Sequence, residues 1–343
     1  MTPLSSSAAT HQPYTFQAQW TEKNQHLQSS TGEKIKQFFL GFINNLCRRT
    51  VLPSSSLSNT QRQIAHENFH MFWHGKVSYP MQDLLRASYS PTSCTLTTPD
   101  GTELNATYFR HNEADETSDT VICFQPNAAL SKMQAFQWLM KESLLKDKKT
   151  NFVIFDYRGC GESKGKAQSA KDLIQDADTV YQFVQNKLHV PPHKIHLYGW
   201  SLGGGISAEL KALHPEHTGK YVNERSFKSL SKLCKTLTPS TKFNRLAVNL
   251  LKFFGWNIKA NRRIDSWAGE KKIVYHPQDP VIKTAGLAQY LQGKDLARHK
   301  EIMNLQDSIP IPFGERINHH CHPLVAYVSP PLSPKKEIAD FLF

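Results

Sequence analysis

Three short apolar runs separated by helical patterns constrain the fold more than any other feature of the chain. The runs are TVICF (Thr120 to Phe124), NFVIF (Asn151 to Phe155) and KIHLY (Lys194 to Tyr198). Runs this short and apolar are typical of strands buried on both faces of a parallel sheet. The helical patterns lie from Met133 to Leu145 and from Ala170 to Leu188. This alternation predicts an α/β fold with a mostly parallel central sheet flanked by helices.

The chain before these runs divides into two parts. Residues 1–90 are rich in Ser, Gln, Asn and Thr, which indicates an N-terminal extension that is only partly helical. The segment CTLTTPDGTELNATYF then has two strand-like stretches around Pro99-Asp100-Gly101, a pattern that predicts an antiparallel hairpin. We therefore expect residues 91–343 to form the α/β domain.

One amphipathic, basic stretch stands out in the extension, GEKIKQFFLGFINNLCRRT. Its apolar residues recur at spacings of three and four and have basic neighbours, which predicts a helix. The apolar residues are Ile35, Phe38, Phe39, Phe42, Ile43 and Leu46, and the basic ones are Lys34, Lys36, Arg48 and Arg49. Such a helix can lie on a membrane surface. Packing of the apolar stripe on a neighbouring domain is commoner, and we expect that arrangement.

The charge is strongly basic and unevenly distributed. The 41 Lys and Arg exceed the 29 Asp and Glu by twelve, and the stretch from Lys211 to Lys272 holds fourteen basic and four acidic residues. A local field of this kind attracts anionic lipid, nucleic acid or an acidic partner, although a solvated basic face gives the same pattern. Basic and aromatic residues are not interleaved in a nucleic-acid-binding motif, so nucleic acid is not an expected partner.

Targeting signals and cysteine pairs are also informative. No window reaches the roughly 18 consecutive apolar residues of a membrane-spanning helix, and the first residues lack the pattern of a secretory signal. The six cysteines include no C-x-x-C pair, which argues against a zinc ribbon and a disulfide scaffold. We expect a cytoplasmic or peripheral membrane protein.

Two G-x-S-x-G matches compete for the role of nucleophile. Gly199-Trp200-Ser201-Leu202-Gly203 directly follows an apolar run and precedes the helical pattern ISAELKAL. A reactive serine needs this position, because a sharp turn between strand and helix lifts its hydroxyl above the sheet edge. The second match holds Ser163, which lies beyond DYRGCGE in a loop. The sequence therefore favours Ser201.

A serine hydroxyl needs a general base that is oriented by an acid. Asp279 follows the apolar run Ile273 to Tyr275, where a carboxylate lies at the carboxyl edge of the sheet, although an Asp before Pro also occurs in turns. Asp265 and Asp295 are weaker rivals. The candidate bases are His319, His320 and His322. Adjacent histidines diverge and no further ligands accompany them, so neither a metal nor another cofactor is expected.

The motifs carry a resemblance. From about Pro91 onward, FQPNAA, FDYRGCGES, GWSLGGG, HPQDPVI and HHCHPL fall in the order used by the α/β-hydrolase superfamily, which the chain resembles. More narrowly, it resembles the CHLPS-type hydrolase-like proteins of intracellular bacteria, whose activity is poorly defined. The resemblance implies Ser201 as nucleophile, Asp279 as acid and His320 as base, with His319 and His322 as alternatives. It also leaves delivery into a host cell open.

The oxyanion hole is expected from two backbone N–H groups. One belongs to Leu202 and the other to the loop after the TVICF strand. That loop reads Gln125-Pro126, and because proline has no N–H, Asn127 or Ala128 has to supply the second donor. By the same resemblance, Asp156 and Arg158 stabilise a turn and have no catalytic part.

A cap insertion at about residues 225–268 is expected above the carboxyl edge of the sheet. It contains the helical pattern Phe243, Leu246, Ala247, Leu250, Phe253 and Phe254 among basic residues. An apolar, basic cap suits a lipid-like or acyl substrate. We expect a serine hydrolase that cleaves a carboxylic ester or thioester of a small molecule or lipid through an acyl-enzyme. The alternative is a catalytically silent scaffold that binds a partner or an anionic membrane surface through the cap.

Overall fold

The computed structural model describes residues 12–74, 80–127, 129–132, 137–237, 241–264, 269–292, 300–305, 309–310, 327–328 and 334–343. The strands are β1 (Tyr14–Gln17), β2 (Tyr89–Thr97), β3 (Glu103–His111), β4 (Thr120–Phe124), β5 (Asn151–Phe155), β6 (Ile195–Trp200), β7 (Tyr221–Glu224), β8 (Lys271–Tyr275), β9 (Lys300–Asn304), β10 (Ile309–Pro310) and β11 (Tyr327–Val328).

The α-helices are α1 (Thr31–Phe39), α2 (Gly41–Val51), α3 (Asn59–His74), α4 (Pro80–Ser88), α5 (Gln137–Leu145), α6 (Ala170–Gln182), α7 (Leu202–Leu213), α8 (Leu230–Leu237), α9 (Thr241–Phe253), α10 (Ala260–Ile264), α11 (Leu287–Gln292) and α12 (Pro334–Leu342). A short 3-10 turn, η2 (Pro53–Ser56), follows α2, and a π-helical turn (Phe183–Lys187) extends α6. The helical prediction for 170–188 is thereby confirmed, and that for 133–145 is confirmed from residue 137 onward.

The described strands from β1 to β9 form a single mixed sheet in the order β1-β2-β3-β5-β4-β6-β7-β8-β9. The predicted hairpin is confirmed as the antiparallel pair β2 and β3, and β3 is antiparallel to β5. From β5 to β9 every neighbouring pair is parallel. The strands predicted at 120–124 and 151–155 have those bounds, and the one predicted at 194–198 runs from Ile195 to Trp200. The predicted α/β class is therefore confirmed.

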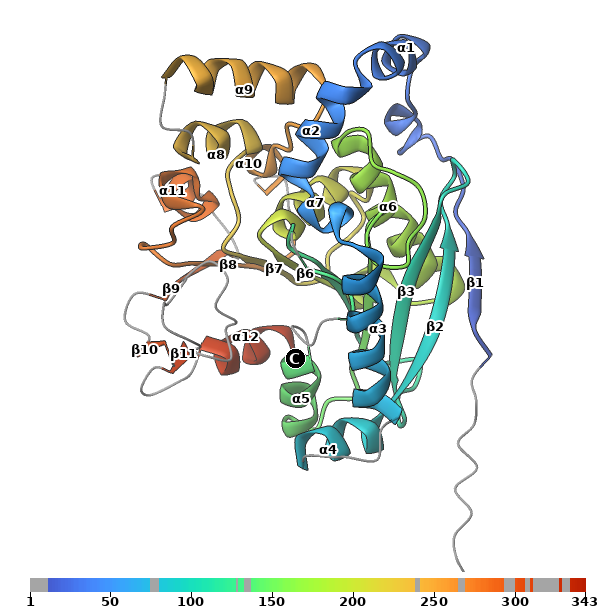
Figure 1. The fold of residues 1–343 in the computed structure, drawn as a ribbon. Coiled ribbons are helices and arrows are strands. Elements are labelled where there is room, and N and C mark those ends of the chain that lie inside the picture. Colours follow the sequence, from blue (N-terminus) through green and yellow to red (C-terminus); the bar gives the residue numbers. More distant parts are fainter. Residues whose placement is uncertain are drawn as a thin grey trace, which may run out of the picture.

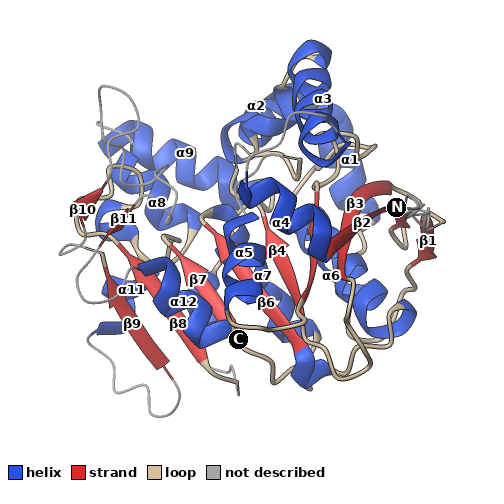
Figure 2. Cartoon of the chain, turned by 90° about the horizontal axis from the view of Figure 1, so that it is seen from below, coloured by secondary structure: helices blue, strands red, loops and turns tan. Residues whose placement is uncertain are grey.

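Each central strand supplies two hydrophobic cores, one on each face of the sheet. Ile122 and Phe124 of β4 enter the core that also contains residues of α6, α7 and α11. Val121 and Cys123 of the same strand enter the core built with α4, α5 and α12. Helices accordingly cover both faces in Figures 1 and 2. Apolar residues at consecutive positions are thus all buried, which is why these strands read as continuous apolar runs.

The expectation for the amphipathic N-terminal stretch is wrong in two respects. The stretch forms two helices, α1 and α2, which are separated at Leu40. Its apolar stripe is exposed rather than packed on the domain: Phe38 is 82% exposed and Phe42 is 85% exposed. The side of α2 that faces the protein presents Asn44, Cys47 and Val51. Helical periodicity identified the apolar side of the stretch but not the direction in which it points.

The chain between β7 and β8 contains the helices α8, α9 and α10. Figure 1 shows them on the side of the sheet that α6 and α7 cover, and α9 contacts α1 through Phe253 and Lys36. Residues before α4 also contribute to the sheet, because β1 pairs in parallel with β2. Among the helices that the structure describes, none is both long and apolar enough to cross a membrane.

Burial of His217 after α7 makes the stability of the fold depend on pH. Its side chain is 1% exposed, and burial together with the nearby cation of Lys211 lowers the pKa of His217 to about 3. Below about pH 6.5 the imidazole of His217 binds a proton in the unfolded chain, whereas in the folded chain it stays neutral until the pH approaches 3. His217 therefore stabilises the fold fully above about pH 6.5, and this contribution is lost as the pH falls toward 3.

We expect the variant His217→Gln to lose this dependence. Between pH 7 and pH 5 the unfolding free energy of the wild-type protein should fall by ~2 kcal/mol more than that of the variant. Urea unfolding at both pH values measures the difference. Asp156 and Asp176 change the unfolding free energy with pH in the opposite direction, because burial raises the pKa of each to about 6. Both proteins contain these two residues, so their contribution cancels in the comparison. Equal pH slopes in the two proteins contradict the prediction.

Candidate active site

Ser201 lies in a strained turn between β6 and α7. β6 ends at Trp200 and α7 begins at Leu202, as the sequence predicted. The backbone of Ser201 has φ 52° and ψ −112°, a conformation that costs a non-glycine residue roughly 1–3 kcal/mol. Such strain persists only where the surrounding structure imposes it, and it clusters at functional sites. The geometry matches the sharp strand-to-helix turn that exposes a nucleophilic serine.

Close backbone packing forces this turn and explains the two glycines of the motif. A Cβ on Gly203 would lie 2.2 Å from the carbonyl oxygen of Phe124, at the end of β4. A Cβ on Gly199 would lie 2.5 Å from Oγ of Ser207 and 2.7 Å from the carbonyl oxygen of Gly203. Any larger residue at either position pushes α7 away from the sheet. The spacing G-x-S-x-G is therefore a packing requirement of this turn.

Two residues that the sequence did not indicate hold Ser201 in place. The backbone N–H of Ser201 donates to the carbonyl oxygen of Glu224 on β7 at 2.9 Å. The hydroxyl of Ser226 donates to the carbonyl oxygen of Ser201 at 2.7 Å. Neither Glu224 nor Ser226 belongs to a recognisable sequence motif. Their contacts with Ser201 become apparent only from the pairing of β6 with β7. Arg225 lies between them and also has a positive φ, of 45°.

The loop after β4 lies beside the first turn of α7, because Gly203 contacts the carbonyl groups of Phe124 and Gln125. Leu202 is the first residue of α7, and the first N–H groups of a helix have no acceptor within that helix. Both features agree with an oxyanion hole at this point. Of the two predicted second donors, Asn127 is partly buried in the loop, and Ala128 lies outside the described residues.

Ser54 of η2 fixes the position of Asn127. Its backbone N–H and its hydroxyl both donate to the carbonyl oxygen of Asn127, at 3.2 Å and 3.0 Å. The two residues are 73 positions apart, so no local pattern in the sequence could indicate the contact. A segment of the N-terminal extension thus orients the loop that is expected to supply an oxyanion donor.

Asp279 is buried in the loop after β8, with 4% of its surface exposed. Its Oδ1 accepts the backbone N–H groups of Val281 and Ile282, at 2.9 Å and 2.7 Å. Hydrogen bonds of this kind favour the ionised carboxylate and fix its direction. The carboxylate follows β8, the second strand after the nucleophile strand β6 in the sheet, and lies in the loop where the sequence predicted an acid. The rivals Asp265 and Asp295 lie outside the described residues.

The three candidate bases also lie outside the described residues. His319, His320 and His322 all fall within 311–326, so the choice among them stays a prediction. His276, which the sequence did not indicate, lies three residues before Asp279. Its Nδ1 accepts the backbone N–H of Gln278 at 3.1 Å. Among the residues described, no group of three or more His, Cys, Asp or Glu is arranged to hold a metal ion.

Ser163, the serine of the second G-x-S-x-G match, has a structural environment. It is 4% exposed, its hydroxyl donates to the carbonyl oxygen of Asp156 at 2.7 Å, and it accepts the backbone N–H of Asn105 at 2.8 Å. The neighbouring thiol of Cys160 is also buried, and burial raises its pKa to about 12. Both side chains of this loop are thereby engaged in packing rather than exposed to a substrate.

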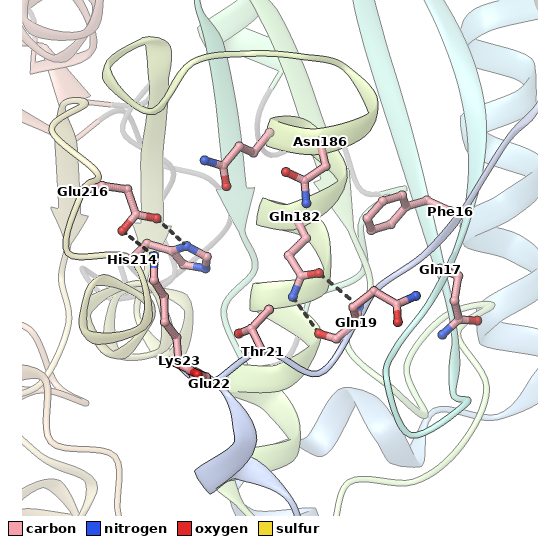
Figure 3. Close-up of a pocket in the computed structure, with 11 residues that line it drawn as sticks. Phe16, Gln17, Gln19, Thr21, Glu22, Lys23, Gln182, Asn186, His214 and Glu216 are labelled. Carbon is pink, nitrogen blue, oxygen red and sulfur yellow. Dashed lines mark hydrogen bonds and ion pairs between the residues drawn. The ribbon is translucent and has the colours of Figure 1, made fainter.

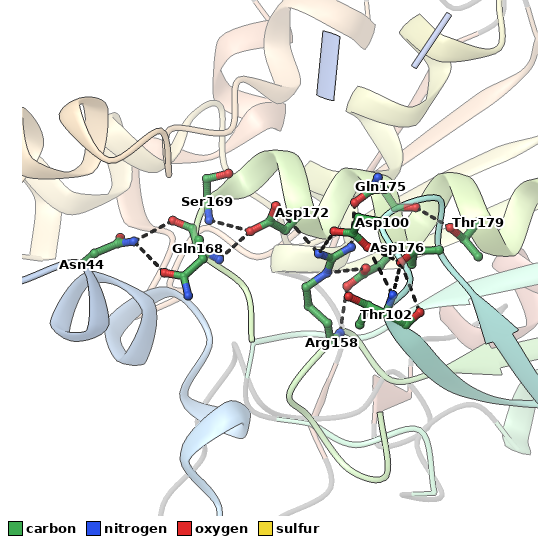
Figure 4. Close-up of polar contacts among 11 residues, drawn as sticks. Asn44, Asp100, Thr102, Arg158, Gln168, Ser169, Asp172, Gln175, Asp176 and Thr179 are labelled. Atoms are coloured by element: carbon green, nitrogen blue, oxygen red, sulfur yellow. Dashed lines mark hydrogen bonds and ion pairs between the residues drawn. The ribbon is translucent and has the colours of Figure 1, made fainter. Parts of the chain in front are cut away.

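Asp156 and Arg158 stabilise the loop after β5. The carboxylate of Asp156 accepts the N–H and the hydroxyl of Ser131 at 2.6 Å and 2.8 Å. Arg158 donates to Asp176 at 2.7 Å and to Asp100 at 2.8 Å, and Figure 4 shows it inside this cluster of carboxylates. These contacts agree with the turn-stabilising part expected from the sequence.

A pocket of about 640 Å³ lies away from Ser201. It is formed where β1 and the following residues meet α6 and the chain after α7, and Figure 3 shows the contacts that line it. Gln19 and Gln182 exchange two hydrogen bonds there, and Lys23 pairs with Glu216 at 2.9 Å. None of its lining residues is a candidate catalytic residue, so we assign the pocket to the docking of β1.

Comparison with known proteins identifies the fold. The alpha/beta hydrolase fold family model matches residues 120–263, which run from β4 through α10 and include Ser201. Two solved structures have a TM-score of 0.50. They are an α/β hydrolase from Vibrio vulnificus, at 16% identity over 72% of this chain and 86% of that one, and an acetyl xylan esterase from Paenibacillus sp. R4, at 14% identity over 75% and 90%. The fold is the α/β-hydrolase fold.

Relatives by sequence include the alpha/beta hydrolase domain-containing protein WAV2 of Arabidopsis thaliana, at 27% identity over 43% of this chain and 46% of that protein. The uncharacterized protein YfhR of Salmonella typhimurium is 34% identical over 34% of this chain and 40% of that protein. The chain thus spans less than half the length of these curated relatives. These matches show that part of the chain is similar to proteins with the α/β-hydrolase fold.

Substitution of Gly203 tests whether packing against Phe124 shapes the turn. We expect Gly203→Ala to destabilise the fold by ~1–3 kcal/mol, because the added methyl group overlaps backbone atoms that cannot rotate away. Gly32→Ala is the matched control. A Cβ there meets nothing within 4 Å, and alanine within helix α1 is favourable by ~0.5–1 kcal/mol. Thermal unfolding of both variants measures the effect, and equal melting temperatures contradict the packing argument.

Proposed function

We propose that the protein is a serine hydrolase that cleaves a carboxylic ester or thioester, with a lipid-like or acyl group as the favoured substrate. The observation that carries the proposal is the strained backbone of Ser201, held between β6 and the N-terminus of α7. The fold supports it because the superfamily uses this turn for a nucleophile. One structural neighbour is also named as an esterase.

The proposed reaction passes through an acyl-enzyme. Oγ of Ser201 attacks the carbonyl carbon while His320 accepts the hydroxyl proton, and Asp279 orients the imidazole. The N–H groups of Leu202 and of Asn127 or Ala128 stabilise the oxyanion. Collapse of the tetrahedral intermediate expels the alcohol or thiol, which takes the proton from His320. Water, activated in the same way, then releases the carboxylic acid and restores the serine hydroxyl.

The narrower relationship to CHLPS-type proteins of intracellular bacteria is part of the proposal, as is delivery into a host cell. Both rest on the order of the motifs in the sequence, chiefly GWSLGGG, HPQDPVI and HHCHPL. We also propose that the basic helices between β7 and β8, α8 to α10, form a cap over the acyl group. Their apolar residues suit an acyl chain.

A fluorophosphonate probe tests the nucleophile directly. We expect the wild-type chain to be labelled at neutral pH and Ser201→Ala not to be labelled, because the probe bonds only to an activated serine. Asp279→Asn and His320→Gln should slow labelling by roughly a thousandfold or more. His276→Gln is the matched control, since its ring nitrogen Nδ1 is held by Gln278. Absence of labelling in the folded wild-type chain favours the catalytically silent scaffold instead.

The same assay assigns the base among the three histidines. Loss of labelling in His319→Gln or His322→Gln, with His320→Gln unaffected, keeps the serine mechanism but overturns the assignment of His320.

Ser54 provides a test of the oxyanion loop. We expect Ser54→Ala to lower kcat for a p-nitrophenyl ester roughly tenfold with little change in KM, because a loosened Asn127 weakens only transition-state binding. Ser54→Thr retains the hydroxyl and should restore kcat. The matched control is Ser55→Ala, since the hydroxyl of Ser55 bonds to Leu52 instead. A rise in KM alone, or equal effects of the two alanine variants, contradicts a positioning role for Ser54.

A further inference from the structure

The outward face of α1 and α2 is apolar, which reverses the usual arrangement of a surface helix. Six large apolar side chains are exposed by 37 to 85% of their surface: Ile35, Phe38, Phe39, Phe42, Ile43 and Leu46. Leu246 and Phe253 of α9 are also exposed, by 55% and 51%. Monomeric soluble proteins rarely expose contiguous apolar patches larger than a few hundred Å², and larger ones mark interaction sites. We call this surface the apolar face.

Specific hydrogen bonds fix the rotation of α2 about its own axis. The exposure of its apolar stripe therefore follows from these contacts. Asn44 is 1% exposed. Its amide donates to the carbonyl oxygen and the side chain of Gln168 at 3.0 Å and 3.1 Å, and its Oδ1 accepts Nε1 of Trp256 at 2.7 Å. Figure 4 shows the contact with Gln168. Rotating the helix to bury Phe42 would remove all three bonds.

Helix α9 joins the apolar face through contacts with α1. Nζ of Lys36 donates to the carbonyl oxygen of Phe253 and lies 4.5 Å from the centre of its ring. Figure 1 shows α1, α2 and α9 together at one end of the molecule, away from α5. Two segments about 200 residues apart in the chain thus build one surface.

The helices that form the apolar face are rich in basic residues and poor in acidic ones. The exposed cations are Lys34, Arg49, Lys166, Lys242, Arg245 and Lys252. No acidic residue occurs from Leu230 to Ile264 in the sequence. Glu33, the acidic residue of α1 and α2, pairs with Lys171 at 3.0 Å. The patch therefore combines exposed apolar side chains with an excess of positive charge.

From this combination we infer that the apolar face docks on an anionic lipid bilayer. Phenylalanine and leucine side chains enter the acyl boundary while Lys and Arg contact the headgroups, as in interfacial amphipathic helices. A second copy of the chain fits less well. A two-fold dimer brings a surface against itself, so the positive charges around the two faces would meet.

Co-sedimentation with vesicles tests the inference, using the full chain with Ser201→Ala so that binding is measured without turnover. We expect binding to phosphatidylcholine vesicles containing about 30% phosphatidylserine and much weaker binding to phosphatidylcholine alone. Raising the salt from about 50 to about 500 mM should weaken binding. Because no catalysis is involved, failure of the labelling test leaves this test unaffected.

Two pairs of variants locate the binding surface. Phe38→Ser with Phe42→Ser should weaken binding roughly a hundredfold, and Lys34→Glu with Arg49→Glu roughly thirtyfold. The exposure of all four side chains leaves the fold intact, which circular dichroism checks. Matched controls are Leu145→Ser, which is 63% exposed on α5, and Lys148→Glu, which is exposed just after that helix. Both should bind as the parent does.

Three results overturn the inference. The folded chain fails to bind anionic vesicles, or binds them equally at low and high salt. The phenylalanine and charge variants bind as tightly as the controls. Light scattering finds a dimer that Phe38→Ser with Phe42→Ser converts to a monomer, without vesicle binding, which assigns the apolar face to a second copy of the chain.

Discussion

The contact between the first turn of α7 and the end of β4 is the constraint on which the candidate site depends. Gly203 approaches the carbonyl group of Phe124 so closely that no side chain fits between them. The helix therefore starts directly above the sheet edge, and Ser201 has to adopt a positive φ to connect strand and helix. The same approach brings the loop after β4 next to the helix N-terminus. One packing contact thus determines the position of both the serine and the expected oxyanion donors.

The N-terminal extension contacts the loops around this site and holds them in place. Ser54 holds the carbonyl group of Asn127 in the loop after β4. Arg62 of α3 donates to the carbonyl oxygens of Gly159 and Gly161, each at 3.0 Å, in the loop after β5. Both loops leave the carboxyl ends of parallel strands, which is where α/β folds place their reactive groups. The extension therefore limits how far these loops can move relative to Ser201.

The sequence predicted those features that depend on local pattern and missed those that depend on distant contacts. Strands β4 and β5 are predicted residue for residue, because burial on both faces favours apolar side chains at every position after the first polar one, Thr120 or Asn151. Ser201 is predicted because the turn requires glycines at fixed spacing. The direction of α2 is not, since it depends on Asn44 bonding to Gln168 and Trp256, which are 124 and 212 residues away. Periodicity describes a helix but contains no information about its neighbours.

The apolar face and the oxyanion loop are connected by a short, rigid piece of chain. α2 leads through Val51 and Leu52, which are 6% and 0% exposed, directly into η2 and Ser54. Because these residues are buried in the same hydrophobic core as Tyr157 and Cys160, a tilt of α2 on the protein would disturb the anchor of Asn127. The proposed docking of α1 and α2 on lipid would consequently fix the orientation of the sheet edge and of Ser201 relative to the bilayer. An acyl substrate drawn from that bilayer, as proposed, would then meet the serine from one direction.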